Sequence, residues 1–118
     1  MAVPGRNMEI DVLEVALKRK GPQSFVLLDV REPDEVARVN LGPGVEVVPL
    51  SRLAMEQLAA LPAAAQAKDA EIIVFCHHAM RSLRVAHWLA QQGWTNVRSM
   101  AGGIDAYARQ VDPSIGRY

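Results

Sequence analysis

A short buried strand that leads through a polar loop into a helix constrains this chain more than any other feature. Residues 71–75 are a mostly apolar, β-branched run, residues 76–82 read Cys-His-His-Ala-Met-Arg-Ser, and residues 83–92 have the spacing of an amphipathic helix. The N–H groups at the start of a helix lack partners within the helix, and the helix dipole adds partial positive charge there. Cys76 is the only cysteine in the chain, and this position favours its thiolate over its thiol. The sequence therefore indicates a nucleophile at Cys76.

The N-terminal part of the chain begins with a helix pattern followed by a strand pattern. Residues 11–20 are predicted to form a helix, opened by Asp11 and Glu14 at the spacing of a capping box. Its recurring apolar positions are Leu13, Ala16 and Leu17. Residues 25–30 are a continuous apolar run interrupted only by Asp29, which is typical of a central strand covered on both faces.

The next segment carries turn and helix-start signals. Residues 31–38 can begin a helical turn, because proline is tolerated at a first helical position and acidic residues favour that end. Residues 40–44 are expected to form a turn, and residues 45–48 a brief extended piece. Ser51 is a candidate N-cap for a helix over residues 52–61.

The C-terminal half predicts a βαβ unit. Residues 63–70 are alanine-rich and fit either a helical extension or a surface connector. Beyond the helix at 83–92, residues 97–100 are predicted to form a strand parallel to the one at 71–75, and residues 104–109 a last short helix. This alternation places the chain in the α/β class, with helices on both faces of a largely parallel sheet.

Length and charge limit the number of domains and the classes of partner. A chain of 118 residues, half of them apolar, fits a single domain over residues 1–118, with a core of about 9–110 and a tail at 111–118. Thirteen basic residues balance thirteen acidic ones, so we expect neither nucleic acid nor a membrane surface as a partner. We see no signal peptide over residues 1–7 and no membrane span, and the lone cysteine fits a reducing compartment; these features favour a cytoplasmic protein.

Four motifs follow one another along the chain. They are Leu28-Asp29-Val30-Arg31-Glu32-Pro33, the Cys-x4-Arg-Ser loop from Cys76 to Ser82, Gly93-Trp94-Thr95-Asn96-Val97, and Ala101-Gly102-Gly103-Ile104-Asp105-Ala106-Tyr107. Together, over about residues 11–107, they resemble a single-domain rhodanese, a sulfurtransferase. The chain departs from the family pattern at residues 40–45, where His-Ile-Pro-Gly-Ala is usual, and at Tyr107, where tryptophan is usual. The resemblance implies a rhodanese-like fold with a central, mostly parallel five-stranded sheet.

The resemblance also implies a reaction. Cys76 would accept a sulfane sulfur from a donor such as thiosulfate, become a persulfide, and pass the sulfur to cyanide or a thiol, without a metal or an organic cofactor. A persulfide carrier or regulatory module that exchanges sulfur with a partner protein is an alternative. A small cysteine phosphatase or arsenate reductase is disfavoured, because four residues between Cys76 and Arg81 make a smaller loop than the Cys-x5-Arg loop of the phosphatases.

The loop supplies most of the candidate substrate-binding residues. We expect the site to be lined by His77, His78, Ala79, Met80, Arg81 and Ser82, largely through their backbone N–H groups. The Arg81 side chain is expected to brace the loop, with Glu32 or Glu35 as a possible ion-pair partner. The family match places Arg31 at the pocket rim, where it would attract an anionic donor, and Asp29 is expected to support the strand end.

The adjacent histidines suggest two further interpretations, a metal site with Cys76 and acid–base work. Neighbouring histidines on a tight loop point in different directions, and the sequence holds no further ligand cluster, so we expect no zinc site. The rings of His77 and His78 would set the polarity of the loop mouth. Partial protonation of these rings would favour anionic donors at lower pH.

Overall fold

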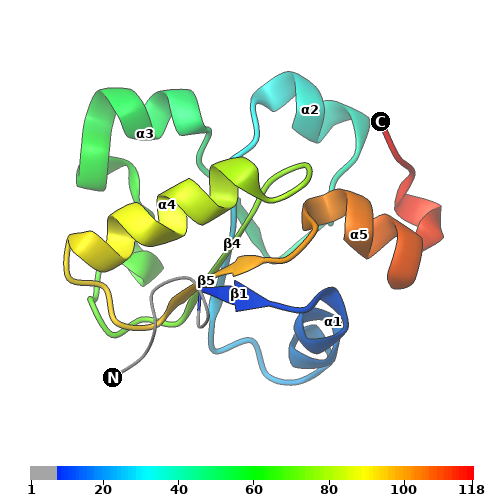
Figure 1. The fold of residues 1–118 in the computed structure, drawn as a ribbon, viewed down its shortest axis with the longest axis horizontal. Helices are drawn as coiled ribbons and strands as arrows, with labels where there is room; N and C mark the ends of the chain where they lie inside the picture. Colours follow the sequence, from blue (N-terminus) through cyan, green and yellow to red (C-terminus); the bar gives the residue numbers. More distant parts are fainter. Residues whose placement is uncertain (1–7) are drawn as a thin grey trace.

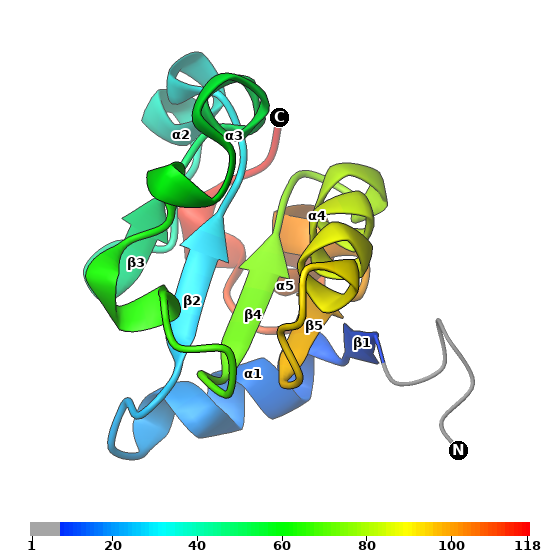
Figure 2. The same ribbon diagram turned by 90° about the vertical axis from the view of Figure 1, so that its left-hand side faces the viewer.

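Within residues 8–118, which a computed structural model describes, five strands form one parallel sheet with helices on both faces (Figures 1 and 2). The strands are β1 (Glu9–Ile10), β2 (Val26–Asp29), β3 (Val45–Val47), β4 (Ile72–Phe75) and β5 (Val97–Met100). The helices are α1 (Val12–Lys20), α2 (Pro33–Arg38), α3 (Leu50–Glu56), α4 (Met80–Gln91) and α5 (Gly103–Gln110), with 3-10 turns η1 (Gln57–Ala60), η2 (Ala63–Ala65) and η3 (Pro113–Ile115). The strand order is β1-β5-β4-β2-β3, and each neighbouring pair is parallel. The predicted α/β fold with a five-stranded parallel sheet is confirmed.

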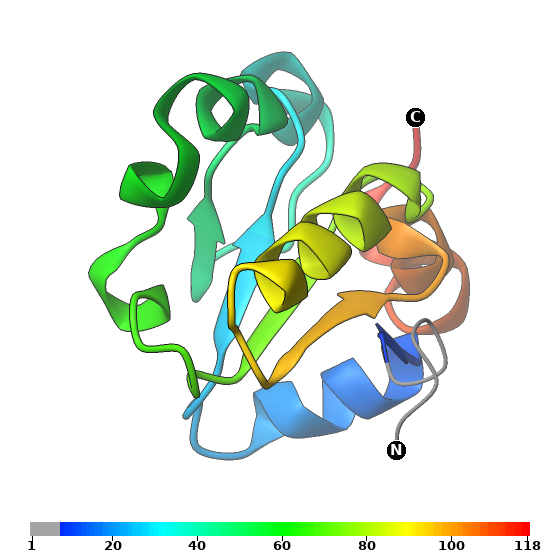
Figure 3. The same ribbon diagram turned by 60° about the vertical axis from the view of Figure 1, so that its left-hand side comes forward.

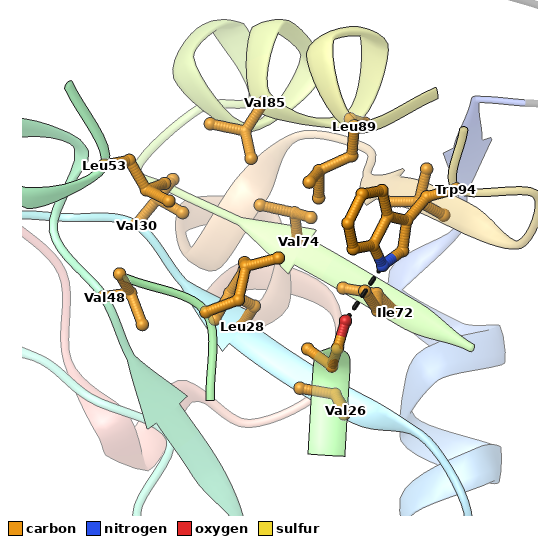
Figure 4. Close-up of a cluster of buried hydrophobic side chains, with 14 of the residues drawn as sticks. Val26, Leu28, Val30, Val48, Leu53, Ile72, Val74, Val85, Leu89 and Trp94 are labelled. Carbon is orange, nitrogen blue, oxygen red and sulfur yellow. Dashed lines mark hydrogen bonds between the residues drawn. The ribbon is translucent and has the colours of Figure 1, made fainter. Parts of the chain in front are cut away.

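One face of the sheet packs against α3 and α4. Figure 4 shows this cluster of alternate strand residues and helix residues, labelled as Val26, Leu28, Val30, Val48, Leu53, Ile72, Val74, Val85, Leu89 and Trp94. Trp94 belongs to this cluster, and its indole N–H donates to the Ala65 carbonyl at 2.9 Å. Cys76 belongs to the same cluster. The nucleophile candidate therefore lies on the α4 side of the sheet.

The opposite face packs against α1 and α5 (Figure 3). The predicted apolar face of α1 is wrong, because Leu13 and Leu17 are 52% and 67% exposed. Val12 and Val15, which are 1% and 0% exposed, enter the core instead. Asp11 caps the helix by accepting a hydrogen bond from the Leu13 N–H, so the helix begins at Val12. Val15, three residues later, therefore lies on the same inner face as Val12.

Helix α3 begins earlier than the sequence suggested. Pro49, not Ser51, is its N-cap, because the Pro49 carbonyl accepts the Arg52 and Leu53 N–H groups. The Ser51 hydroxyl instead donates to Glu32 at 2.7 Å. The alanine-rich segment contains only the short turn η2 and otherwise connects irregularly to β4.

The parallel arrangement brings the residues after β2 and β4 to one edge of the sheet. Asp29 pairs with Phe75, and the Val30 N–H donates to the Phe75 carbonyl at 3.1 Å. Cys76 therefore lies beside the chain that follows β2, and side chains from α2 can reach its loop.

Two expectations concern the ends of the chain and its surroundings. Residues 1–7, where we expect no signal peptide, lie outside the described part of the chain. Across residues 8–118, no helix combines the length and the apolar character that crossing a membrane requires. The single domain over residues 1–118 stays a prediction.

Candidate active site

Cys76 follows β4 directly and is 1% exposed. Its sulfur accepts hydrogen bonds from two backbone N–H groups, that of Ala79 at 3.2 Å and that of Ser82 at 3.4 Å. Both donors belong to the N-terminal end of α4, where amide hydrogens and the helix dipole favour negative charge. A thiolate at Cys76 would thus be stabilised although the residue is buried.

The Ser82 hydroxyl contacts the same sulfur atom. Its oxygen is 3.5 Å from the Cys76 sulfur, 2.7 Å from the Ser99 hydroxyl and 3.1 Å from the Ala79 carbonyl, to which it donates. Because this hydroxyl has one proton, Ser99 then donates to Ser82. Ser82 and Ser99 are both fully buried. Ser99 was not predicted from the sequence, although it lies on the same face of the predicted strand as the apolar Val97.

The loop is shorter than predicted, because α4 begins at Met80 rather than Leu83. Ala79 precedes the helix with φ +123°, a conformation that residues other than glycine rarely adopt. Within the described residues, the four other loop amides expected to face the sulfur make no hydrogen bond to it; they belong to His77, His78, Met80 and Arg81. Two amides, not a full ring, therefore contact the sulfur of Cys76.

Arg81 forms a bidentate ion pair with Glu35 of α2. The two guanidinium nitrogens lie 2.6 and 2.9 Å from the two carboxylate oxygens. The hydrogen bonds from Arg81 lower the pKa of Glu35 to about 2, and the pairing raises the pKa of Arg81. Glu32, the other partner that the sequence allowed, binds Ser51 instead. The Arg81 side chain thus ties the first turn of α4 to α2.

The expected position of Arg31 at the pocket rim is wrong. Its side chain is 0% exposed, with Nη2 2.8 Å and Nε 3.0 Å from the two carboxylate oxygens of Asp29. A buried guanidinium requires a carboxylate partner, and Asp29 at the end of a buried strand supplies it. Asp29 also accepts the backbone N–H of Arg31 at 3.0 Å. Arg31 therefore supports the strand end and does not face solvent.

The two histidines occupy different environments. The His77 ring is stacked on Tyr118, with ring centroids 4.0 Å apart, and contacts the tilted His78 ring at a centroid distance of 3.9 Å. Burial, together with the neighbouring His78, lowers the pKa of His77. His77 is consequently harder to protonate than an ordinary histidine, which contradicts the expected gain of positive charge at this ring. His78 and Met80 are exposed.

The first turn of α5 packs against the other side of the loop. The N–H groups of Ile104 and Asp105 donate to the carbonyls of Cys76 and His77 at 2.9 and 3.1 Å. Gly103 has φ +64°, and a Cβ atom there would collide with the His77 carbonyl. The glycine pair is therefore needed for close approach as well as for turning, and it allows the first turn of α5 to bind the backbone of Cys76 and His77.

Comparisons with known proteins find similar sequences and similar folds. The family model described as "Rhodanese-like domain" matches residues 11–110. The chain is 37% identical over 113 residues to the Rhodanese-like/PpiC domain-containing protein 12, chloroplastic, of Arabidopsis thaliana, covering 93% of this chain but only 37% of that protein. It is 34% identical over 91 residues to the thiosulfate sulfurtransferase GlpE of Haemophilus influenzae, covering 77% of this chain and 80% of the relative. The crystal structure of a rhodanese-related protein from Thermoplasma volcanium superposes with a TM-score of 0.66 at 26% identity, covering 93% and 94% of the two chains.

Proposed function

The chain belongs to the rhodanese-like domain family, and on that premise we propose that it is a sulfurtransferase in which Cys76 carries the transferred sulfur as a persulfide. The observation that carries the proposal is the pair of N–H groups on the Cys76 sulfur at the start of α4. Amide hydrogens at this place stabilise the nucleophilic thiolate before the reaction and the thiolate that the second step releases.

The reaction has two steps. The Cys76 thiolate attacks the outer sulfur of thiosulfate, the sulfur–sulfur bond of the donor breaks, and its electron pair leaves with sulfite. Cyanide or a thiolate then attacks the outer sulfur of the persulfide, and the electron pair of that bond returns to Cys76. No net redox equivalent is consumed in the transfer to cyanide, which yields thiocyanate.

The loop amides divide between the two sulfur atoms in this scheme. Ala79 and Ser82 hold the inner sulfur, as they do in the free protein. Met80 and Arg81, in the first turn of α4, have amides that lack helical acceptors and can bind the outer sulfur. The bidentate pair of Arg81 with Glu35 keeps this turn in place while the sulfur is exchanged.

Thiocyanate formation from thiosulfate and cyanide tests the proposal. We expect Cys76→Ser to abolish it, whereas Ser24→Ala, an exposed position before β2, retains the parent rate. Circular dichroism of all three proteins controls for folding. Equal rates for the parent and Cys76→Ser, both with cyanide and with a thiol acceptor, would refute the proposal.

A carrier that exchanges sulfur with a partner protein is the second candidate. It is favoured by the 74% exposed side chain of Met80, which offers a partner protein an apolar contact beside the loop. The chain also spans only 37% of the Arabidopsis relative, so further domains accompany this unit there. Persulfide that forms on Cys76 only with a protein donor would favour the carrier.

Phosphate-ester hydrolysis is disfavoured by the contacts of Arg81 as well as by the length of the loop. Both terminal guanidinium nitrogens of Arg81, Nη1 and Nη2, donate to Glu35, so this side chain is engaged outside the loop. Robust hydrolysis of a phosphate ester that is lost in Cys76→Ser would reverse this ranking.

A further inference from the structure

The segment after α5 folds back over the candidate site. Residues 111–118 lie beyond the family match, and η3 directs them toward α2 and the loop before α4 (Figures 1 and 2). The Tyr118 hydroxyl donates to Glu35 at 2.9 Å and accepts from Arg31 at 3.2 Å. Its ring stacks on His77 at an interplanar angle of 11°. One side chain thus contacts the loop, α2 and the end of β2.

Neighbouring contacts hold this segment independently of Tyr118. Arg117 donates to Asp105 at 2.9 and 3.4 Å, and the Asp105 N–H in turn donates to the His77 carbonyl. The side chain of Asp112 caps η3 by accepting from the Ser114 N–H at 3.1 Å. The loss of the Tyr118 hydroxyl alone should therefore leave the segment in place.

The loop needs such support because its conformation is unfavourable. Ala79, whose N–H binds the Cys76 sulfur, has φ +123°. A non-glycine residue in such a region costs about 1–3 kcal/mol and persists only where its surroundings over-determine it. The turn at Gly103 holds the first half of the loop, and the second half is held through Arg81.

Tyr118 completes the support of the second half. The two carboxylate oxygens of Glu35 accept hydrogen bonds from Nη1 and Nη2 of Arg81 and from the Tyr118 hydroxyl. The buried Arg31 fixes the same hydroxyl from the other side. The carboxylate is thereby oriented with both oxygens toward Arg81.

We propose that Tyr118 is a positioning residue, which acts through Glu35 and Arg81 and through the His77 ring to hold the loop where the Ala79 and Ser82 amides reach the Cys76 sulfur. Its effect on sulfur transfer rests on the proposed function, whereas its effect on the reactivity of the thiol does not. Among the described residues, the ionisable groups around the loop include Asp29, Arg31, Glu35, His77, His78, Arg81, Asp105, Arg109, Arg117 and Tyr118.

The test compares Tyr118→Phe with Tyr107→Phe. Tyr118→Phe keeps the ring and removes the hydroxyl. Tyr107→Phe removes a hydroxyl that accepts only from Arg19 on the α1 side, within the described residues. The rate of Cys76 alkylation by iodoacetamide is measured against pH, and sulfur transfer from thiosulfate is resolved into kcat and KM.

We expect Tyr118→Phe to move the pH midpoint of alkylation upward and to lower kcat on the order of tenfold, with KM changed less than about twofold. Tyr107→Phe should match the parent in each measurement. Near-parent thermal unfolding of both variants would exclude a loss of fold as the cause.

The possible outcomes separate the two proposals. A Tyr118→Phe protein with the parent midpoint and kcat overturns the positioning role. Suppose that the parent transfers no sulfur but Tyr118→Phe still shifts the pH midpoint of alkylation. This result would support the positioning role and refute the sulfurtransferase proposal. Equal shifts in Tyr118→Phe and Tyr107→Phe would also overturn the inference, because the effect would then be unrelated to the Glu35 contact.

Discussion

The Ser82 amide and the Ser82 hydroxyl both contact the sulfur of Cys76, at 3.4 and 3.5 Å. The amide can only donate a hydrogen bond, whereas the hydroxyl can accept a hydrogen bond from a thiol. One residue therefore satisfies the sulfur in both protonation states. The Ser99 hydroxyl lies 2.7 Å from the Ser82 hydroxyl and fixes its orientation.

The serine pair predicts non-additive stability effects. Ser82→Ala should destabilise the fold by about 1–3 kcal/mol, because it leaves the buried Ser99 hydroxyl without its partner. Ser99→Ala should cost less, about 1 kcal/mol, since Ser82 still donates to Ala79. The double variant should then lose less than the sum of the two single variants. Urea unfolding of the four proteins measures the coupling, and strictly additive losses would show that the hydroxyls do not interact.

The Arg81–Glu35 pair predicts that lysine cannot replace arginine. Lysine forms a point contact and cannot make the two parallel hydrogen bonds seen here, so Arg81→Lys should lose about 1–2 kcal/mol of unfolding free energy and most of the sulfur transfer. Arg52→Lys is the matched control, because Arg52 and Glu56 form a half-exposed pair worth about 0.5 kcal/mol or less. Equal losses in the two variants, measured by chemical unfolding, would contradict a special role of the bidentate pair.

Glu35 predicts an acid-sensitive part of the stability. Because the pKa of Glu35 in the folded protein is about 2, below its ordinary value of 4.5, its contribution is fully present above pH 4.5. That contribution is lost as pH falls from 4.5 through 2. We expect about 1–2 kcal/mol after allowing for solvent screening of a partly exposed pair. The difference in unfolding free energy between the parent and Glu35→Gln should therefore shrink over this range, and a constant difference would be inconsistent with the pairing.

Gly103 predicts a steric effect that Gly42 does not share. Both glycines have positive φ, but a Cβ atom at Gly42 meets nothing within 4 Å, whereas one at Gly103 collides with the His77 carbonyl. Gly42→Ala should cost about 1 kcal/mol from backbone strain alone. Gly103→Ala should cost about 3 kcal/mol or more and should slow Cys76 alkylation, because the loop must move. Similar thermal stability of the two variants would rule out the close approach.

The sequence predicted those parts of the molecule that depend on local patterns. The strand before Cys76, the parallel pairing and the place of Cys76 between a strand and a helix follow from an apolar run, a loop and a helix close together in the chain. The start of α4 at Met80 did not follow, because Ala79 adopts a positive φ that alanine rarely takes. A rule based on residue type alone could not place that boundary.

Contacts between distant residues account for most of the errors at the site. Arg31 resembles a surface residue in a polar segment, yet it is 0% exposed and donates to Tyr118, 87 residues away in the sequence. Ser99 is 17 residues from Ser82, and Tyr118 is 83 residues from Glu35. Such partners are brought together by the order of the strands and by the path of the tail, which no local pattern encodes.

The most direct test of the account is the intact mass of the protein after incubation with a sulfane sulfur donor and removal of the excess donor. The parent should gain one sulfur atom, located on Cys76 by peptide analysis and removed by a reductant, and Cys76→Ser should gain none. The same gain in Cys76→Ser, or no gain in a parent protein whose Cys76 is alkylated readily, would contradict a persulfide at this cysteine.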